Sequence, residues 1–513
     1  YDIKLDLRYK ARLVCNGNLV DPRGLSTRAT VVKTVSVRLL DVIASSQKLR
    51  VLCGDIGNAF IQATTKEKIY TRLGGEFGSR AGCIALIVKA LYGLTTSAER
   101  FRTLLADFIR SLGFVPSRYD RDVWMRMRDE KDGFDYICTH VDDFKVVARA
   151  PEMWLNYIKG AFLVKESGPR KYYLGNDYTH QEQYNLWTYS GETYTKEAVS
   201  RVERIFGCLP KQSTPLPVTD CHPEMDTSPL LGLEDHRKFQ MLIGMLQWLV
   251  TICRPDLCCL VSSLNRFGSC PREGHLDLAV RAFGYLKCVP APKIAIDHNP
   301  MQFTRTKPDY DALRPDFLED YPDAKEEVDN FPPSFGPVLE TTFMVDSDHA
   351  HDLKTRRSLT GILGFVGSTL VIWKSKRQGA IASSTYAAEF TALRSATEEA
   401  ISLRYMLRSL GCNVPADGSC PTRLFGDNLG VVLSAQNPHA DLSKKHVAIS
   451  FHGVREAIAA GIIAPYWLKG QWNPSDILTK QIPRPGFRTH CDFLFWRPEF
   501  HVRTNNNLSE IKP

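Results

Sequence analysis

The chain contains 513 residues, of which 43% are hydrophobic and 24% are charged, and it carries a formal net charge of +8. This length predicts roughly two to four domains, and a composition so close to the globular average excludes a mainly disordered, collagenous or disulfide-knot protein. No apolar run reaches the roughly 18 residues that a membrane-spanning helix needs, so the sequence predicts no association with a membrane.

The cysteines indicate the redox compartment of the protein, and the first residues indicate whether the chain is a fragment. Fourteen cysteines are scattered along it without a Cys-x-x-Cys pair. In a chain of this size they are typical of reduced core residues in an intracellular protein. The start, Tyr1 to Lys4, lacks both an initiator methionine and a signal-peptide pattern, which indicates a fragment of a longer protein.

The predicted elements mix helices and strands along the whole chain. Apolar residues recur at helical spacing over 98–112, and short β-prone runs occupy 136–138 and 146–148. Beyond residue 337 the pattern continues with three predicted strands and two predicted helices, namely strands at 341–345, 370–373 and 423–426 and helices at 388–410 and 446–460. The pattern predicts an α/β (α+β) fold with a second, smaller domain at its end.

The stretch from Pro300 to Pro337 separates these two parts. It contains seven prolines, and its nine acidic residues outnumber its four basic ones. Because prolines break regular structure and periodic hydrophobicity is weak here, the stretch predicts an irregular, acidic linker. The excess of basic charge therefore falls on the folded parts, which permits a polyanionic partner.

Paired aspartates form the first chemical signal. Asp142 and Asp143 lie between the predicted strands at 136–138 and 146–148, which is the pattern of a hairpin with acids at its tip. Adjacent carboxylates repel each other, and Mg²⁺ offsets that repulsion while also binding substrate phosphates. A solvated turn is the alternative interpretation. Upstream, Asp55 ends another apolar strand and is followed five positions later by Phe60.

At these residues the chain resembles the reverse transcriptase of copia-type long-terminal-repeat retrotransposons. The order and spacing of the motifs carry the resemblance, since several of them are weak individually. The matching residues are Lys10–Val14, Ser36–Arg38, Asp55 with Ala59 and Phe60, Leu91–Leu94, His140–Asp143, Leu174–Gly175, Arg254–Asp256, His275 and Tyr285–Lys287.

The resemblance implies a two-metal polymerase site. Asp55, Asp142 and Asp143 would hold two Mg²⁺ ions, with Mn²⁺ as a substitute, that activate a primer 3′-hydroxyl toward a deoxynucleoside triphosphate. Two further roles are implied. Lys10 and Arg12 would bind the triphosphate, and the Phe60 ring would restrict the space at the 2′ position of the sugar. The alternatives are solvated surface charges for the two basic residues and an ordinary core position for Phe60.

Two departures from the family pattern bear on activity. His140 replaces the usual tyrosine before Val-Asp-Asp, and Thr95-Thr96 replaces the usual Lys-Gln after Leu94. Loss of that glutamine puts polymerase efficiency in question. The substitutions are the evidence for an alternative function, that of a decayed or domesticated remnant that binds nucleic acid without polymerising.

Four spaced carboxylates form the second signal. Asp346 and Asp427 end predicted strands, Glu389 begins a helix, and Asp476 opens a final segment. Strand ends and helix starts meet at one edge of an α/β sheet, so these groups can share metal ions, although each alone is more often structural. Asp348 competes with Asp346, which we favour because it directly follows the apolar strand.

These four acids resemble the Asp-Glu-Asp-Asp set of ribonuclease H. The resemblance implies two Mg²⁺ ions, an activated water and cleavage of the RNA strand of an RNA–DNA hybrid. Predicted substrate contacts are Lys374, Lys376, Arg377 and His446, each of which could instead be a solvated or packed side chain.

The resemblance also implies a division of the chain into domains and a set of binding partners. We expect fingers and palm at 1–218, a thumb- or connection-like helical region at 219–299, the linker at 300–338, a ribonuclease H-like domain at 339–482 and a tail at 483–513. Expected partners are an RNA template, a DNA primer, RNA–DNA hybrids, deoxynucleoside triphosphates and the integrase, protease and capsid-like parts of the same polyprotein. Expected locations are the cytoplasm, virus-like particles within it, or the nucleus. An unrelated hydrolase with coincidental aspartates is the least favoured alternative.

Overall fold

The computed structural model describes the chain except residues 1, 4–8, 11–12, 18–19, 21–25, 130–131, 219–220, 303–309, 329, 440–447 and 499–513. It divides into two compact units. Unit 1 comprises Tyr1–Leu40 and Lys48–Arg170, and unit 2 comprises Asp41–Gln47 and Lys171–Pro513. Among the described residues, no helix has both the length and the apolar character required to cross a membrane.

Unit 1 is built on a six-stranded sheet with the order β10-β3-β9-β8-β7-β6, in which every neighbouring pair is antiparallel. Its strands are β3 (Arg50–Ile56), β6 (Val115–Pro116), β7 (Val123–Asp129), β8 (Gly133–His140), β9 (Asp143–Ala148) and β10 (Val164–Pro169). Helices α3 (Ser97–Ser111) and α4 (Pro151–Ala161) supply apolar side chains to the core beneath it. The predicted helix at 98–112 and the strands at 136–138 and 146–148 are confirmed.

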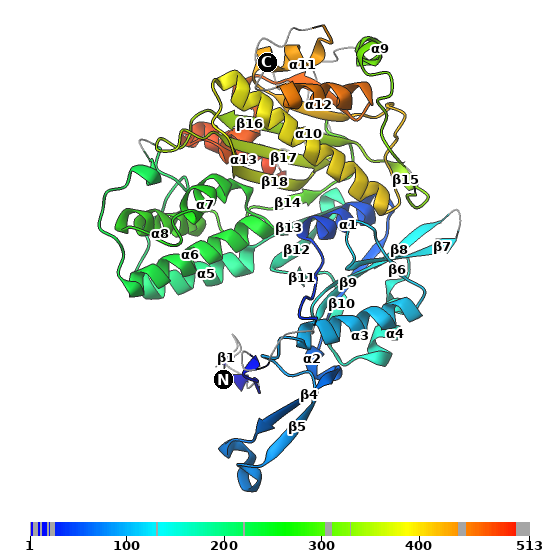
Figure 1. Cartoon of the computed structure of the whole chain (residues 1–513), viewed down its shortest axis with the longest axis vertical. Helices are drawn as coiled ribbons and strands as arrows, with labels where there is room; N and C mark the ends of the chain where they lie inside the picture. Colours follow the sequence, from blue (N-terminus) through cyan, green and yellow to red (C-terminus); the bar gives the residue numbers. More distant parts are fainter. Residues whose placement is uncertain are drawn as a thin grey trace. The chain divides into compact units, whose positions relative to one another are not determined.

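A separate hairpin projects from unit 1 (Figure 1). Its strands are β4 (Thr64–Arg72) and β5 (Ile84–Lys89), which among the described strands pair only with each other and are joined through the 3₁₀ segment η2 (Gly75–Arg80). The short helix α2 (Ala59–Gln62) leads into it from β3. Two further strands, β1 (Asp2–Ile3) and β2 (Tyr9–Lys10), pair near the start, and α1 (Thr34–Ser46) crosses from unit 1 into unit 2.

Unit 2 begins with a small sheet and a group of helices. The sheet has the order β11-β12-β13-β14, and the helices follow β13 in the chain. The bounds are β11 (Tyr172–Tyr173), β12 (Asn176–Gln181), β13 (Leu186–Ser190), α5 (Glu192–Phe206), α6 (Leu233–Ile252), α7 (Cys258–Asn265), α8 (Glu273–Cys288) and β14 (Ile294–Ile296).

One of the family landmarks is part of the core of this helical region. The side chains of Arg254 and Asp256 are fully buried and form an ion pair of 2.7 Å, and the Tyr285 hydroxyl donates to Asp256 at 2.6 Å. Since a buried charge is stable only with its partner and its hydrogen bonds in place, these residues hold the fold of the region. The buried ion pair is therefore a structural reason for the presence of Arg254 and Asp256 in this motif.

A five-stranded sheet with the order β18-β17-β16-β20-β21 carries the rest of unit 2. Strand β16 is antiparallel to β17 and parallel to β20, and α10 crosses one face of the sheet (Figure 1). The bounds are β15 (Phe335–Val338), β16 (Thr341–Asp348), β17 (Leu359–Val366), β18 (Thr369–Arg377), α10 (Thr385–Ser409), β19 (Cys412–Asn413), β20 (Thr422–Gly426), α11 (Leu429–Gln436), α12 (Ala448–Ala459), β21 (Ile463–Trp467) and α13 (Arg484–Leu494).

The sequence predicted this part well. All three predicted strands and the helix at 388–410 are confirmed, and α12 accounts for the described part of the helix expected at 446–460. The Ser384 hydroxyl accepts a hydrogen bond from the Ala387 amide, so the Ser/Thr-rich entry does cap α10.

The prediction of an irregular linker at 300–338 is wrong for much of that stretch. It forms the helix α9 (Tyr310–Asp320) and the strand β15, and the Phe317 side chain is fully buried. Glu326 accepts hydrogen bonds from Arg404 and Arg408 of α10 at 2.6–2.9 Å, with all three side chains buried. Composition could not reveal this, because the arginines that pair with Glu326 lie about 80 residues further along the chain.

We expect Glu326→Ala to lower the free energy of unfolding of unit 2 by about 3–5 kcal/mol, because it leaves two buried guanidinium groups without their counter-charge. Urea denaturation followed by tryptophan fluorescence measures this. The matched control is Glu327→Ala, at the neighbouring exposed acid, which should change stability by less than about 0.5 kcal/mol. Equal effects of the two substitutions would contradict a packed segment.

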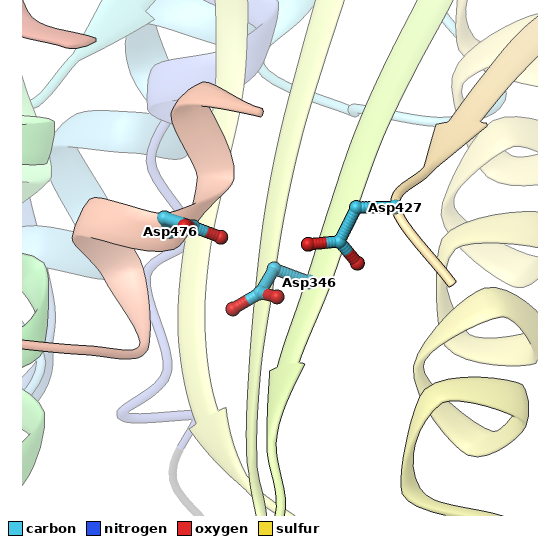
Figure 2. A group of neighbouring side chains, drawn as sticks. All are labelled: Asp346, Asp427 and Asp476. Carbon is cyan, nitrogen blue, oxygen red and sulfur yellow. The ribbon is translucent and has the colours of Figure 1, made fainter. Parts of the chain in front are cut away.

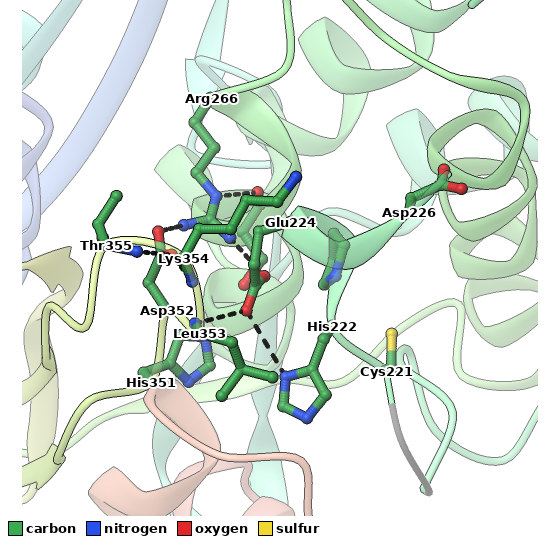
Figure 3. A network of polar contacts seen from close by, with 12 residues as sticks. Cys221, His222, Glu224, Asp226, Arg266, His351, Asp352, Leu353, Lys354 and Thr355 are labelled. Atoms are coloured by element: carbon green, nitrogen blue, oxygen red, sulfur yellow. Dashed lines mark hydrogen bonds and ion pairs between the residues drawn. The ribbon is translucent and has the colours of Figure 1, made fainter. Parts of the chain in front are cut away.

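A network of charged groups joins the helical region to the five-stranded sheet inside unit 2 (Figure 3). Arg266, which follows α7, pairs with Glu224 at 2.7 Å and also with Asp352 in the loop after β16. Arg377 at the end of β18 pairs with the same Asp352 at 2.8 Å, and both carboxylates are buried. The Trp373 indole donates to the Val250 carbonyl at 2.6 Å. The two parts of unit 2 therefore share buried polar contacts.

Candidate functional site

The first group of acids lies where β3 meets the β8–β9 hairpin in unit 1. Strand β8 ends at His140 and β9 begins at Asp143, so Val141 and Asp142 form the turn, and Val141 adopts a φ of 58°. Asp55 near the end of β3 is the direct cross-strand partner of Asp143. Partners in an antiparallel pair project to the same face with Cβ atoms about 5 Å apart, so these two carboxylates share one face of the sheet.

Electrostatics supports the proximity of the three acids. Burial, then the charge of Asp142, then that of Asp55 raise the pKa of Asp143 to about 7. The Lys165 ammonium lies 3.5 Å from the Asp55 carboxylate and partly offsets its charge. A site that gathers three aspartates with one exposed lysine nearby favours a divalent cation, which would relieve the remaining repulsion.

Residues predicted to bind the nucleotide are only partly described. The side chain of Lys10 and all of Arg12 lie outside the described residues. Phe60 is half-buried at the start of α2, and its ring centroid lies 5.0 Å from that of Tyr92 in the family's signature tetrapeptide. The ring also packs against the core of unit 1, so its contacts fit the core interpretation as well as the nucleotide role.

The second group of acids lies at one edge of the five-stranded sheet in unit 2. Asp346 is on β16, Asp427 directly follows β20, and Asp476 is in the 3₁₀ segment η8 (Pro474–Leu478). One carboxylate oxygen from each lies within 4.8 Å of the others, and Figure 2 shows Asp346 between its two neighbours. The parallel pairing of β16 with β20 brings these strand ends together, as the sequence predicts.

Glu389 of α10 joins this group electrostatically. Burial and the charges of Asp346 and Asp427 raise its pKa to about 9. Glu389 and Asp427 line the same open depression, of about 470 Å³, together with Lys480. Burial and the charge of Asp346 likewise raise the pKa of Asp427, and they raise that of Asp476 to about 7. Asp346, Asp427 and Asp476 therefore form one group, and Glu389 lies close enough for the charges of Asp346 and Asp427 to raise its pKa.

Asp346 and Asp348 occupy different environments. The Asp346 side chain is fully buried within the acid group, whereas Asp348 is 34% exposed and forms a 2.8 Å ion pair with His351. Asp348 lines the depression without joining the three-carboxylate group among the described residues. Its placement favours the choice of Asp346 over Asp348.

Two residues at this site, Thr479 and Lys480, were not predicted. The Lys480 ammonium donates to Asp346 at 2.9 Å and to Asp476 at 3.3 Å, and the Thr479 hydroxyl donates to Asp346. The ammonium partly neutralises the acids, and they in turn raise its pKa although burial lowers it. A sequence signal was available, since Thr479 and Lys480 follow the predicted ligand Asp476 by three and four residues.

The predicted phosphate contacts on β18 do not gather with the acids. Cross-strand register pairs Ser375 with Gly361 and Gly361 with Asp346, so Ser375 and Asp346 project to the same face of the sheet. Because neighbouring residues of a strand project to opposite faces, Lys374 and Lys376 lie on the other face. Lys374 pairs there with Glu399 of α10, and Arg377 pairs with Asp352. Lys374 and Lys376 are exposed, and Arg377 is half-buried. His446 lies outside the described residues.

The donor sets of both groups fit Mg²⁺ or Mn²⁺. All the predicted ligands are carboxylate oxygens, which these hard cations prefer, and the raised pKa values reflect burial and then repulsion, which a cation would relieve. In unit 1 the holding residues would be Asp55, Asp142 and Asp143. In unit 2 they would be the four acids Asp346, Glu389, Asp427 and Asp476.

Known proteins resemble this chain over most of its length. Residues 1–214 match the family described as reverse transcriptase (RNA-dependent DNA polymerase). The chain is 26% identical over 495 residues to the retrovirus-related Pol polyprotein from transposon RE1 of Arabidopsis thaliana, covering 94% of this chain and 30% of that protein. It is 24% identical over 512 residues to the corresponding polyprotein from transposon TNT 1-94 of Nicotiana tabacum, covering 95% of this chain and 34% of that one.

The chain thus spans about a third of the length of these curated relatives. One solved structure, the N-terminal RNase H domain of a Mycobacterium tuberculosis protein fused to maltose binding protein, overlaps 30% of this chain and 96% of that one. Its identity of 14% and TM-score of 0.21 are too low to support an argument. Residues 1–214 are thus similar to the reverse transcriptase family, and over most of its length the chain resembles retrovirus-related Pol polyproteins of transposons.

Proposed function

We propose that this chain is the RNA-directed DNA polymerase of a copia-type retrotransposon and that it also cleaves the RNA strand of RNA–DNA hybrids. The observation that carries the proposal is the pairing of Asp55 with Asp143 at the tip of the β8–β9 hairpin, inside the residues that match the reverse transcriptase family. The carboxylates of Asp346, Asp427 and Asp476 support the second activity, because they converge from three separate elements.

In this proposal each acid group performs a metal-assisted phosphoryl transfer. Bound Mg²⁺ would lower the pKa of the attacking hydroxyl or water and neutralise charge on the phosphate. In unit 1, which would provide fingers and palm, Asp55, Asp142 and Asp143 orient the primer end and the nucleotide. In unit 2 the buried Asp346, held by Thr479 and Lys480, fixes the edge against which Glu389, Asp427 and Asp476 position the hybrid.

The proposal extends to partners and location. The substrates would be an RNA template, a DNA primer, the hybrid and deoxynucleoside triphosphates, and the remaining polyprotein segments would supply integrase, protease and capsid-like functions. The related Pol polyproteins are about three times longer than this chain, which supports that expectation. We place the protein in the cytoplasm, within virus-like particles, with access to the nucleus.

We expect the purified chain with Mg²⁺ to extend an oligo(dT) primer on poly(rA) and to shorten a labelled RNA hybridised to DNA. Chelation of the cation should abolish both activities, and Asp142→Asn should abolish only the first. A chain that binds the primed template but incorporates no deoxynucleotide would contradict the proposal. That outcome would support the decayed-remnant alternative, for which Thr95, Thr96 and His140 are the sequence evidence.

A further inference from the structure

The β4–β5 hairpin of unit 1 presents one face that is both apolar and basic. In β4 the exposed positions alternate with half-buried ones, and cross-strand register places Tyr70 opposite Leu86 and Arg72 opposite Ile84. The relative exposures of Tyr70 and Ile84 are 62% and 71%. We call this surface the outer face, and it comprises Lys66, Lys68, Tyr70, Arg72, Ile84, Leu86 and Val88.

The inner face of the hairpin is already satisfied. Ile87 is buried, the Thr65 hydroxyl donates to the Ile87 carbonyl at 2.9 Å, and Glu67 pairs with Arg100 of α3 at 2.5 Å. Contact with unit 1 therefore accounts for the inner face but leaves the outer aliphatic row in solvent. A two-stranded hairpin is marginally stable alone, and a clustered exposed apolar surface usually marks a binding site.

The charges on the outer face identify the kind of partner. Lys66, Lys68 and Arg72 flank Tyr70 along one strand, and no carboxylate of the described residues pairs with their side chains. The nearest acid in the sequence, Glu67, is on the inner face, where Arg100 neutralises it. A row of unpaired cations beside an aromatic ring and aliphatic side chains suits a phosphate backbone with unstacked bases.

The position of the hairpin in the chain fits the same partner. Strand β4 begins at Thr64, directly after α2 and close in sequence to Asp55 at the acid group of unit 1. The hairpin and the acid group therefore belong to the same compact unit.

We propose that the outer face of the β4–β5 hairpin binds single-stranded RNA, with phosphates along the Lys66–Arg72 row and a base stacked on Tyr70. The inference rests on the proposed function for the identity of the strand, namely the unpaired template. The binding itself requires neither a metal ion nor a nucleotide, so it can be measured apart from catalysis.

The experiment measures binding of the full chain to a fluorescein-labelled 20-nucleotide RNA by anisotropy, in EDTA, at KCl concentrations from 50 to 300 mM. Tyr70→Ala should weaken binding about 5- to 150-fold, the effect of losing one stacked base. Lys68→Gln with Arg72→Gln should reduce the slope of log K against log salt by about 1.4, because two phosphate contacts are lost.

The matched control uses the same residue types on α4 of the same unit. Tyr157 is 53% exposed and Lys159 is exposed, so Tyr157→Ala and Lys159→Gln should leave affinity and slope unchanged. Thermal melting of each variant checks folding, and all substituted positions are exposed. If the hairpin variants bind RNA like the unchanged chain, the proposal is overturned, whether or not the chain polymerises.

A protein partner would give a different result. Light scattering of the same variants would then show a self-association that Tyr70→Ala or Leu86→Ser disrupts, while RNA affinity stays unchanged. That combination overturns the RNA proposal. Loss of RNA affinity in the hairpin variants at constant mass supports it, and loss of DNA synthesis alone would bear only on the proposed function.

Discussion

Replacing Asp143 by asparagine is expected to abolish DNA synthesis while making the metal-free protein more stable above pH 7. The loss of synthesis, about 1,000-fold or more, follows from removing a proposed ligand of the catalytic cations. The gain in stability follows from the pKa of Asp143, which burial and its two acidic neighbours raise to about 7. An asparagine carries no charge to bury or to repel.

The pH dependence has a definite sign. In the unfolded chain the Asp143 carboxyl ionises near pH 4, whereas in the folded protein it ionises near pH 7. The unchanged protein therefore loses stability as the pH rises through that window, and the loss stays constant above it. We expect the Asn variant to gain about 1–4 kcal/mol relative to the unchanged protein between pH 4 and pH 7, measured by urea denaturation in EDTA.

Asp135 on the neighbouring strand β8 is the matched control. Its carboxylate accepts from Arg128 at 2.8 Å and from the Trp154 indole at 2.8 Å, so its charge is partnered. Asp135→Asn should destabilise the protein at every pH where Asp143→Asn stabilises it. If both substitutions change stability in the same direction, the acids of the hairpin tip do not repel one another as we infer.

The second large effect is expected at Asp346 in unit 2. Asp346→Asn should reduce cleavage of the RNA strand by about 1,000-fold, whereas Asp348→Asn should reduce it by less than about 10-fold. The physical reason is the difference in environment, since Asp346 lies within the acid group and Asp348 pairs with His351 at its margin. Gel analysis of an end-labelled hybrid measures both rates.

Two further measurements keep this prediction sharp. Asp346 accepts hydrogen bonds from Thr479 and Lys480, so its substitution also removes contacts that support the fold. Asp427→Asn is the second variant, because it removes an acid whose pKa is raised by burial and repulsion. We expect the Asp427 variant to lose cleavage activity without a loss of stability. Primer extension by each variant should stay within about threefold of the unchanged chain, because the acids proposed for the polymerase site are in unit 1. Comparable loss of cleavage in the Asp346 and Asp348 variants would contradict the assignment.

Local sequence was sufficient to predict the acid groups and their supporting strands. Asp55, Asp346 and Asp427 each come at or just after the end of a short apolar run, and strand ends meet at sheet edges whatever the details of packing. The hairpin with Asp142 and Asp143 at its tip needed only its two flanking runs. These features depend on neighbours in the sequence, so the sequence reveals them.

Features that depend on distant partners were beyond prediction. The docking of Glu326 on Arg404 and Arg408 required knowing which buried arginines lacked a counter-charge. The placement of Lys374 and Lys376 on the face away from Asp346 required the register across three strands. Periodicity gives the alternation along one strand but not which face its neighbours leave to the acids.

The polar junction between the helical region and the five-stranded sheet limits how the chain can be subdivided. A recombinant fragment starting near residue 339 would expose the buried Asp352 without Arg266 and would leave the Trp373 indole without the Val250 carbonyl. Such a truncation would tend to aggregate or lose the arrangement of the acids in unit 2, whereas one starting at Lys171 would retain both partners. The helical region and the five-stranded sheet would therefore be inherited as one module, because a division of the chain at residue 338 breaks these contacts and a division at residue 170 leaves them intact.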